Sequence, residues 1–316
     1  MVPKRELCDP PGGLVKGSAN NPTLTAVPGV EVGHWTSDED QTGVTVMVFP
    51  EPNVAAAEFR GAAPGSRETA LLGPEMRIQQ IQALVFTGGS AFGLATADGV
   101  VRELAAMGRG HPTRNGPVPI VPAAVIYDLD RPSAFHPGAS QGAQAFRNRS
   151  ARPVEEGRCG AGRGATTSQW RGVSAVQPSG LGSARVDVGE ATVGALAVVN
   201  SVGDVFTLEG EPLTGGFVVP LPTPVALQAH TNTTLVAIAT DARLTRNELF
   251  RLCVRAQDAV AVCIRPSHTR YDGDTVFAVS CGLGSGDPDG LGEAAFEATG
   301  RAIASAVACA RPEQPV

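Results

Sequence analysis

Two short motifs in the last third of the chain contain groups that could carry chemistry. The first, Asp272-Gly273-Asp274, places two carboxylates two residues apart, directly before an apolar run typical of a strand. Such side chains point to the same side of a strand, and carboxylates that lie close together titrate as a pair. An acid–base site and a simple turn are both open interpretations. A calcium loop is excluded, because Val276 and Phe277 stand where oxygen ligands or a glycine are needed.

The second motif is Asn232-Thr233-Thr234, at the start of another apolar run. If the chain were cut before Thr233, the freed α-amine, with an ordinary pKa of about 7.7, would be a base able to activate the neighbouring hydroxyl. An ordinary strand start is the alternative, because this tripeptide alone is common. It also matches the N-glycosylation pattern, but we expect no glycosylation, since the N-terminal residues contain no apolar segment of a signal peptide.

Two glycine-rich segments resemble phosphate-binding loops. Gly88-Gly89-Ser90 follows a predicted strand and precedes a predicted helix that Ser90 could cap. Backbone amides at such a helix start could bind a carboxylate or an oxyanion, or the glycines could form only a tight turn. Residues 160–165 fit the dinucleotide pattern, but the polar sequence before them does not predict the strand which that fingerprint requires.

Alternation and turn residues predict the elements that must position these groups. Helices are expected after Ser90, from the Thr245–Glu248 capping box to Pro266, and over the alanine-rich residues 292–310. The C-terminal third is therefore a β-α-β-α unit, and 212–224 form a surface excursion or linker. Strands are expected over 43–49, 84–87, 121–129, 192–200, 233–240 and 275–280.

Composition excludes several classes of protein. A net charge of −6 and an aromatic content of 5% argue against nucleic-acid binding and against an anionic membrane surface. The only lysines are Lys4 and Lys16, so no catalytic lysine is available in the body of the chain. The six cysteines include no C-x-x-C pair, which argues against zinc ribbons and redox dithiols. No apolar stretch is long enough to span a bilayer, so we expect a cytoplasmic protein.

Longer motifs resemble a known family. The chain is similar to the self-processing N-terminal-nucleophile peptidases that include L-aminopeptidase D-Ala-esterase/amidases, β-peptidyl aminopeptidases and nylon-oligomer (6-aminohexanoate oligomer) hydrolases. The match extends from about residue 24 to the C-terminus. The segments that carry it are residues 28–35, 60–69, 84–100, 119–129, 196–205, 232–244 and 268–280.

The resemblance implies an α/β fold, a four-layer α-β-β-α sandwich of the aminopeptidase/ornithine acetyltransferase-like kind. It also implies autocleavage between Asn232 and Thr233 into pieces 1–232 and 233–316, with Thr233 as the N-terminal nucleophile. Residues 1–22 are expected to form a flexible arm, and 23–316 a single catalytic domain.

The same resemblance implies roles for other side chains. Asp272 and Asp274 orient the amine and hydroxyl of Thr233, and the Tyr127 hydroxyl and Asn200 amide stabilise the oxyanion. Gly88, Gly89 and Ser90 line the substrate pocket. Where some relatives carry a catalytic lysine, Gln169 aligns here, and Arg171 is the nearest cation. Arg171 could hold a substrate carboxylate but cannot act as a base.

The expected function is therefore hydrolysis of a small peptide or amide, with no metal or organic cofactor, by a homo-oligomer (tetramer or larger). Two alternatives stay open. One is an acyltransferase of the ornithine acetyltransferase type, in which an amine acceptor outcompetes water. The other is an uncleaved homologue that keeps the fold but has no catalytic activity.

Overall fold

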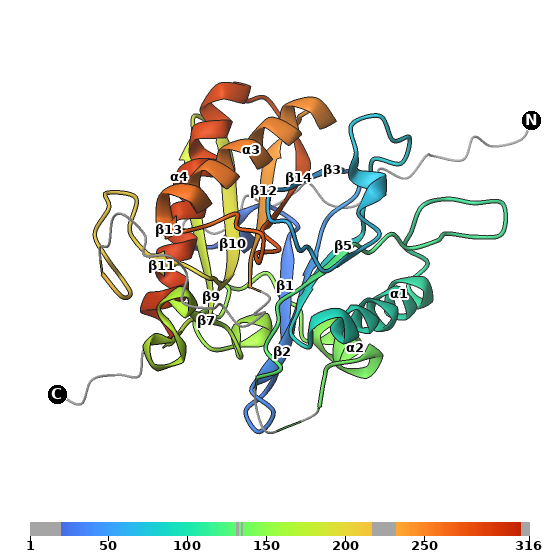
Figure 1. Ribbon diagram of the computed structural model, residues 1–316. Coiled ribbons are helices and arrows are strands. Elements are labelled where there is room, and N and C mark those ends of the chain that lie inside the picture. Colours follow the sequence, from blue (N-terminus) through green and yellow to red (C-terminus); the bar gives the residue numbers. More distant parts are fainter. Residues whose placement is uncertain (1–19, 131–132, 134, 217–231, 311–316) are drawn as a thin grey trace, which may run out of the picture.

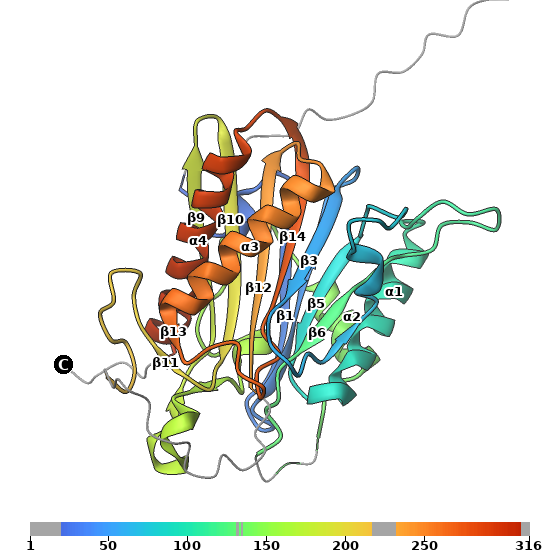
Figure 2. The same cartoon turned by 45° about the horizontal axis from the view of Figure 1, so that its top comes forward.

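The computed structural model describes residues 20–130, 133, 135–216 and 232–310. Nearly all of the expected N-terminal arm, and residues 217–224 of the expected linker, lie outside these ranges. Within them the chain forms four layers, two helices on each outside and two five-stranded sheets between them (Figure 1; Figure 2). The predicted α-β-β-α sandwich is confirmed.

The first sheet has the strand order β1-β2-β5-β6-β4 and is covered by α1 and α2. Only β5 and β6 run parallel, and its other pairs are antiparallel. Its elements are β1 (Glu31–Ser37), β2 (Thr42–Val48), β4 (Ser66–Arg67), β5 (Ala83–Thr87), β6 (Ala123–Val125), α1 (Thr96–Ala106) and α2 (Ala139–Arg147).

The second sheet has the order β3-β14-β12-β10-β9 and is covered by α3 and α4. Its central strands β12 and β14 are parallel and are joined through α3, which is the predicted β-α-β unit. Its elements are β3 (Val54–Phe59), β9 (Leu181–Val188), β10 (Ala191–Asn200), β12 (Thr233–Ala242), β14 (Thr275–Gly284), α3 (Arg246–Cys263) and α4 (Pro288–Ala308).

Short elements connect the layers. They are the two-residue strands β7 (Thr166–Thr167), β8 (Gln177–Pro178), β11 (Asp204–Val205) and β13 (Ile264–Arg265), and the 3-10 helices η1 (Leu24–Ala26), η2 (Ala70–Leu72), η3 (Ser90–Ala95), η4 (Gly160–Gly162), η5 (Gln169–Arg171) and η6 (Val173–Ala175).

Strand β12 is buried on both faces. Leu235 and Ala237 pack between the two sheets, while Val236 and Ile238 pack under α3 and α4. Both faces therefore require apolar residues, which explains the continuous apolar run in place of a strict alternation. The polar residues Thr233 and Thr234 at its first two positions are buried as well, so they lie inside the protein at the end of a rigid strand.

Local signals specify the C-terminal helices. The Thr245–Glu248 capping box is present at the start of α3, where the Thr245 amide donates to Glu248 at 2.8 Å. Helix α4 begins four residues before its expected start, because Asp287 caps it by accepting from the Gly290 amide and Pro288 occupies its first turn.

Two expectations near the glycine turn are wrong. Ser90 does not cap a helix, since it has a left-handed φ of 51° and starts the 3-10 helix η3, with α1 beginning only at Thr96. The expected strand 121–129 pairs only over Ala123–Val125, because the following backbone turns away to bind Ser90 and Asn200. Strands β1, β3 and β9 and helix α2 were not expected from the sequence.

Candidate active site

Thr233 is the first residue of β12, at the end of the sheet where β10 finishes. Asn200, the last residue of β10, lies directly opposite Thr233 in the antiparallel register. Opposed residues in such a pair place their Cβ atoms about 5 Å apart on the same face. Their exposed fractions are 4% and 1%, so the hydroxyl and the amide share a buried environment.

The hydroxyl of Thr233 lies beside the peptide bond that precedes it. Its Oγ1 donates to the carbonyl oxygen of Asn232 at 2.5 Å, and the Gly273 amide donates to the same oxygen at 2.7 Å. A Cβ on Gly273 would come within 2.8 Å of Thr233 Oγ1. The middle residue of the Asp-Gly-Asp motif therefore has to be small, a requirement that the sequence alone did not indicate.

Asp274 binds the backbone next to Thr233. Its Oδ1 accepts from the Thr234 amide at 2.7 Å, and its Oδ2 accepts from both the amide and Nδ1 of His268, each at 2.9 Å. His268 was not expected from the sequence to take part in the site. The sequence did contain one indication of its role. His268 lies in segment 268–280, one of the segments that resemble the family, six residues before Asp274.

Asp272 is the second buried carboxylate and is 1% exposed. Its Oδ2 accepts from the amide of Thr269 at 2.9 Å and from its hydroxyl at 2.7 Å. Burial, followed by the charge of Asp274, raises the pKa of Asp272 to about 7. Burial lowers the pKa of His268, but the hydrogen bond and charge of Asp274 outweigh it, so the net shift is upward. The site thus holds two buried carboxylates, of which Asp272 has its pKa raised to about 7, and a histidine whose pKa is raised by its carboxylate partner.

Asn200 ties two backbone segments together. Its Oδ1 accepts from the Thr166 amide at 3.0 Å, and its Nδ2 donates to the Tyr127 carbonyl at 3.0 Å. An amide nitrogen has two hydrogens, so one remains for a further acceptor. The Tyr127 hydroxyl donates instead to Asp130 at 3.1 Å. The backbone of Tyr127, and not its hydroxyl, is therefore the part that meets Asn200.

The Gly88-Gly89-Ser90 turn is held by Asp128, the residue after Tyr127. Asp128 accepts from the Gly89 amide and from the Thr42 hydroxyl, both at 2.7 Å. A Cβ on Gly88 would lie 2.1 Å from Asp128 Oδ2. The first glycine thus permits the close approach of the carboxylate. Asp128, which holds the turn, directly follows Tyr127, whose carbonyl binds Asn200.

The two candidates for the missing lysine both have protein partners. Arg171 forms an ion pair with the buried Asp204, donates to the Gly216 carbonyl and lies over the ring of Trp170. Gln169 donates to the Thr166 hydroxyl at 2.9 Å. The carboxylate that Arg171 holds in this structure belongs to the protein itself.

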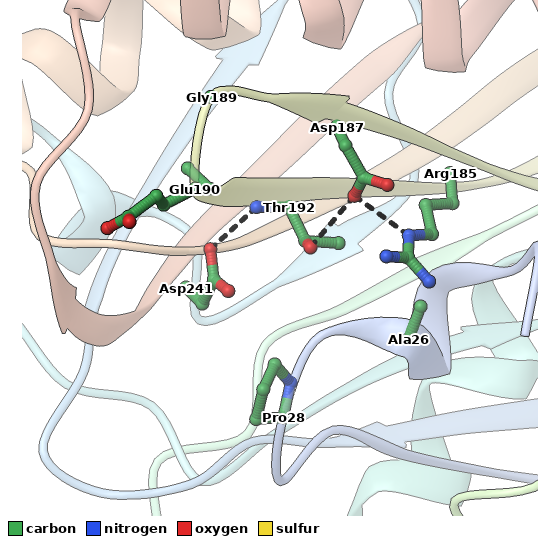
Figure 3. A pocket seen from close by; sticks show the side chains of 9 residues that line it. Ala26, Pro28, Arg185, Asp187, Gly189, Glu190, Thr192 and Asp241 are labelled. Carbon is green, nitrogen blue, oxygen red and sulfur yellow. Dashed lines mark hydrogen bonds and ion pairs between the residues drawn. The ribbon is translucent and has the colours of Figure 1, made fainter. Parts of the chain in front are cut away.

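A cavity of about 280 Å³ lies at the opposite end of the second sheet (Figure 3). It is lined by the β9–β10 turn and the end of β12, including Arg185, Asp187, Glu190 and Asp241. The ten residues of β10 separate it from Asn200 by about 30 Å. The cavity and the buried polar cluster are therefore different places.

Within the ranges that the structure covers, no three His, Cys, Asp or Glu side chains are arranged to hold a metal ion. No helix there is long and apolar enough to cross a bilayer.

Comparison with known proteins identifies similar chains. The sequence profile of peptidase family S58 matches residues 22–314. An uncharacterized aminopeptidase from Mycobacterium leprae is 39% identical over 291 residues, which cover 82% of this chain and 78% of that protein. A 6-aminohexanoate-oligomer endohydrolase from a Kocuria strain is 30% identical over 274 residues, covering 80% and 73%.

A solved structure has the same fold. The L-aminopeptidase D-Ala-esterase/amidase from Ochrobactrum anthropi, described as a variant of the Ntn hydrolase fold, superposes with a TM-score of 0.73 at 23% identity. The superposition covers 95% of this chain and 89% of that one.

Proposed function

Because the chain belongs to peptidase family S58 and is a peptide- or amide-bond hydrolase, we propose that Thr233, freed by self-cleavage after Asn232, is its nucleophile. The family assignment confirms the resemblance inferred from the sequence motifs. The position of the nucleophile and the cleavage itself are the parts that we propose here.

One observation supports this assignment most directly. The Thr233 hydroxyl lies 2.5 Å from the Asn232 carbonyl oxygen, and that oxygen accepts from the Gly273 amide at 2.7 Å. The hydroxyl therefore lies beside the carbonyl that it would attack, and the negative charge that would develop on the oxygen has a backbone donor in place.

The proposed self-cleavage is an acyl shift from nitrogen to oxygen. Thr233 Oγ1 attacks the carbonyl carbon of Asn232, and the Gly273 amide stabilises the oxyanion. The bond from that carbon to the Thr233 nitrogen then breaks, and the hydroxyl proton ends on the nitrogen. Water hydrolyses the resulting ester, which leaves a free carboxylate on Asn232 and a free α-amine on Thr233.

In the proposed catalytic cycle the α-amine of Thr233 takes the proton from its own hydroxyl. The hydroxyl attacks the substrate amide carbonyl, the amine product leaves with that proton, and water releases the acid from the acyl-enzyme. Asp274, which binds the adjacent Thr234 amide, holds the strand end in place, and the second hydrogen of Asn200 Nδ2 is a donor for the substrate oxyanion.

The proposed substrates are small peptides or amides. Relatives are named aminopeptidases and 6-aminohexanoate-oligomer endohydrolases, so the panel to be assayed is L-aminoacyl, D-alanyl and β-alanyl p-nitroanilides together with linear 6-aminohexanoate oligomers. We also propose a homo-oligomeric assembly, which light scattering after gel filtration would test.

Intact mass spectrometry tests the nucleophile before any substrate is known. Wild type should yield a fragment of residues 233–316 with the N-terminal sequence TTLVAIAT. Thr233→Ala should stay whole and hydrolyse nothing in the panel. Thr234→Ala is the matched control, because it removes the neighbouring buried hydroxyl and should still be processed. A wild-type chain that is uncut yet active would overturn the proposal.

A further inference from the structure

His268 contacts the candidate site without touching Thr233. It lies in the loop between β13 and β14 with a left-handed φ of 55°, a conformation uncommon for a residue with a side chain. This backbone geometry lets both its amide and its ring nitrogen Nδ1 reach the same oxygen, Asp274 Oδ2, at 2.9 Å. His268 therefore donates two hydrogen bonds to the same carboxylate oxygen of Asp274.

Both nitrogens of the His268 ring face acceptors. Nδ1 faces the Asp274 carboxylate, and Nε2 faces the carbonyl oxygen of Gln257 on α3 at 3.4 Å. A neutral imidazole has only one N–H, whereas the imidazolium has two. The hydrogen-bond geometry alone therefore favours the charged imidazolium ring.

The charged groups around His268 come from three directions. Asp274 faces the ring from the start of β14, and Asp272 lies beyond it as the second carboxylate of the pair. Arg60, just after β3, is the opposing cation, and its guanidinium is itself paired with Glu58. The carboxylate at 2.9 Å is the nearest of these charges, so it dominates the field at the ring.

The two carboxylates are not equivalent. Asp274 accepts from Thr234 and twice from His268, and one of those donors can carry a full charge. Asp272 accepts from the amide and hydroxyl of Thr269 and from the backbone of Val202, and all three of these donors are neutral. The charge of Asp274 raises the pKa of Asp272, so ionising both buried carboxylates is unfavourable. A single proton shared by the pair therefore goes to the carboxylate with the weaker partners.

We propose that His268 is a positioning residue which, as an imidazolium, keeps Asp274 ionised and so places the proton of the carboxylate pair on Asp272. This inference rests on the proposed function for its catalytic meaning. The ionised Asp274 then holds the Thr234 amide beside the nucleophile, while the neutral Asp272 adds no second negative charge near the Thr233 amine.

The first test measures protonation directly and does not depend on Thr233. Nitrogen-15 NMR of the full chain should show the His268 ring titrating above its ordinary pKa of about 6.5. Asp274→Asn should lower that value by about one pH unit or more, as loss of an adjacent opposite charge does. A His268 that titrates at or below 6.5 in wild type, or that does not respond to Asp274→Asn, would overturn the proposal.

The second test is the pH profile of turnover on whichever p-nitroanilide the wild type cleaves. His268→Asn keeps a donor and tolerates the left-handed backbone, but it cannot carry a charge. The acidic limb of kcat should move upward by about one pH unit, because Asp274 loses its cation. His111→Asn, in a loop of the first sheet, is the matched control and should leave the limb in place.

The outcomes separate the two proposals. If Thr233→Ala still hydrolyses the substrate, the proposed function fails, while the NMR titration continues to decide the role of His268. If His268→Asn lowers only the melting temperature and leaves the acidic limb unchanged, the residue is structural and the positioning role is wrong.

Discussion

The two ends of the β10–β12 strand pair differ in how far their polar residues are buried. At one end, Asn200 and Thr233 are buried and neighbour a carboxylate pair whose members are each 1% exposed. At the other end, Thr192 and Asp241 border an open cavity in which Asp187 and Glu190 reach solvent (Figure 3). The strand pair therefore has a buried polar cluster at one end and a solvent-accessible cavity at the other.

The two ends also differ in how their surroundings act on their carboxylates. At the far end Asp187 is paired with Arg185 and Thr192, and its side chain is half exposed, so solvent screens its charge. At the Thr233 end burial and a neighbouring carboxylate bring Asp272 to a pKa of about 7. Strongly perturbed pKa values of buried groups cluster at functional sites, which supports the proposed site at the Thr233 end.

The largest expected effect comes from changing one aspartate at each end. Asp274→Asn removes the charge that binds His268 and weakens the acceptor of the Thr234 amide, so turnover should fall by about 100-fold or more. Asp241→Asn is the matched control, since Asp241 Oδ1 likewise accepts a backbone amide, that of Thr192, at 2.7 Å. Its activity should stay within about twofold of wild type, as measured by steady-state kinetics. Equal losses in both variants would remove the distinction between the two ends.

The next effect concerns the oxyanion donor. Asn200→Ala should lower kcat by about 100-fold with little change in KM, because a donor that meets charge only as it develops contributes about 2.7 to 4 kcal/mol. The control is Thr192→Ala on the same strand, which loses only its bond to Asp187. A raised KM with unchanged kcat would instead make Asn200 a ground-state contact.

Tyr127→Phe sharpens the same test. The hydroxyl donates to Asp130 in this structure, so an oxyanion role requires it to move during the reaction. If the Tyr127 hydroxyl stabilises the oxyanion, kcat of the pre-cleaved enzyme should fall about as much as in Asn200→Ala. An unchanged kcat would leave Asn200 as the side-chain donor and Tyr127 as a backbone acceptor only.

The last effect is on stability and not on turnover. The folded pKa of Asp272, about 7, lies above its unfolded value, so between pH 4 and pH 7 the folded state binds the extra proton. The free energy of unfolding should therefore fall as pH rises through this window, by about 1.4 kcal/mol per pH unit for one proton. Asp272→Asn should flatten this slope in urea titrations at pH 5 and pH 7. A slope that is the same in both proteins would mean that Asp272 ionises freely.

Much of the second sheet was predictable because its signals are local. Strand β12 begins at Thr233 as expected, and the capping box of Thr245 and Glu248 marks the start of α3. Outer strands were missed in both sheets, β3 and β9 in the second sheet and β1 in the first sheet. Its β6 keeps only three paired residues, since Pro122 precedes it and the backbone beyond Val125 bonds to groups from other elements.

The sequence alone determined the family, because its motifs are long, and the layered fold followed from that resemblance. The residue types that could react were visible in the sequence as well. Only the tertiary structure decided the contacts. The Gly273 amide meets the Asn232 carbonyl, and Arg171 meets Asp204, through pairings of residues more than 30 positions apart. His268 reaches Asp274 through a left-handed loop residue. Such contacts depend on strand register and on backbone conformations that residue types do not specify, which is why the carboxylate pair was visible in the sequence and the partner of Asp274 was not.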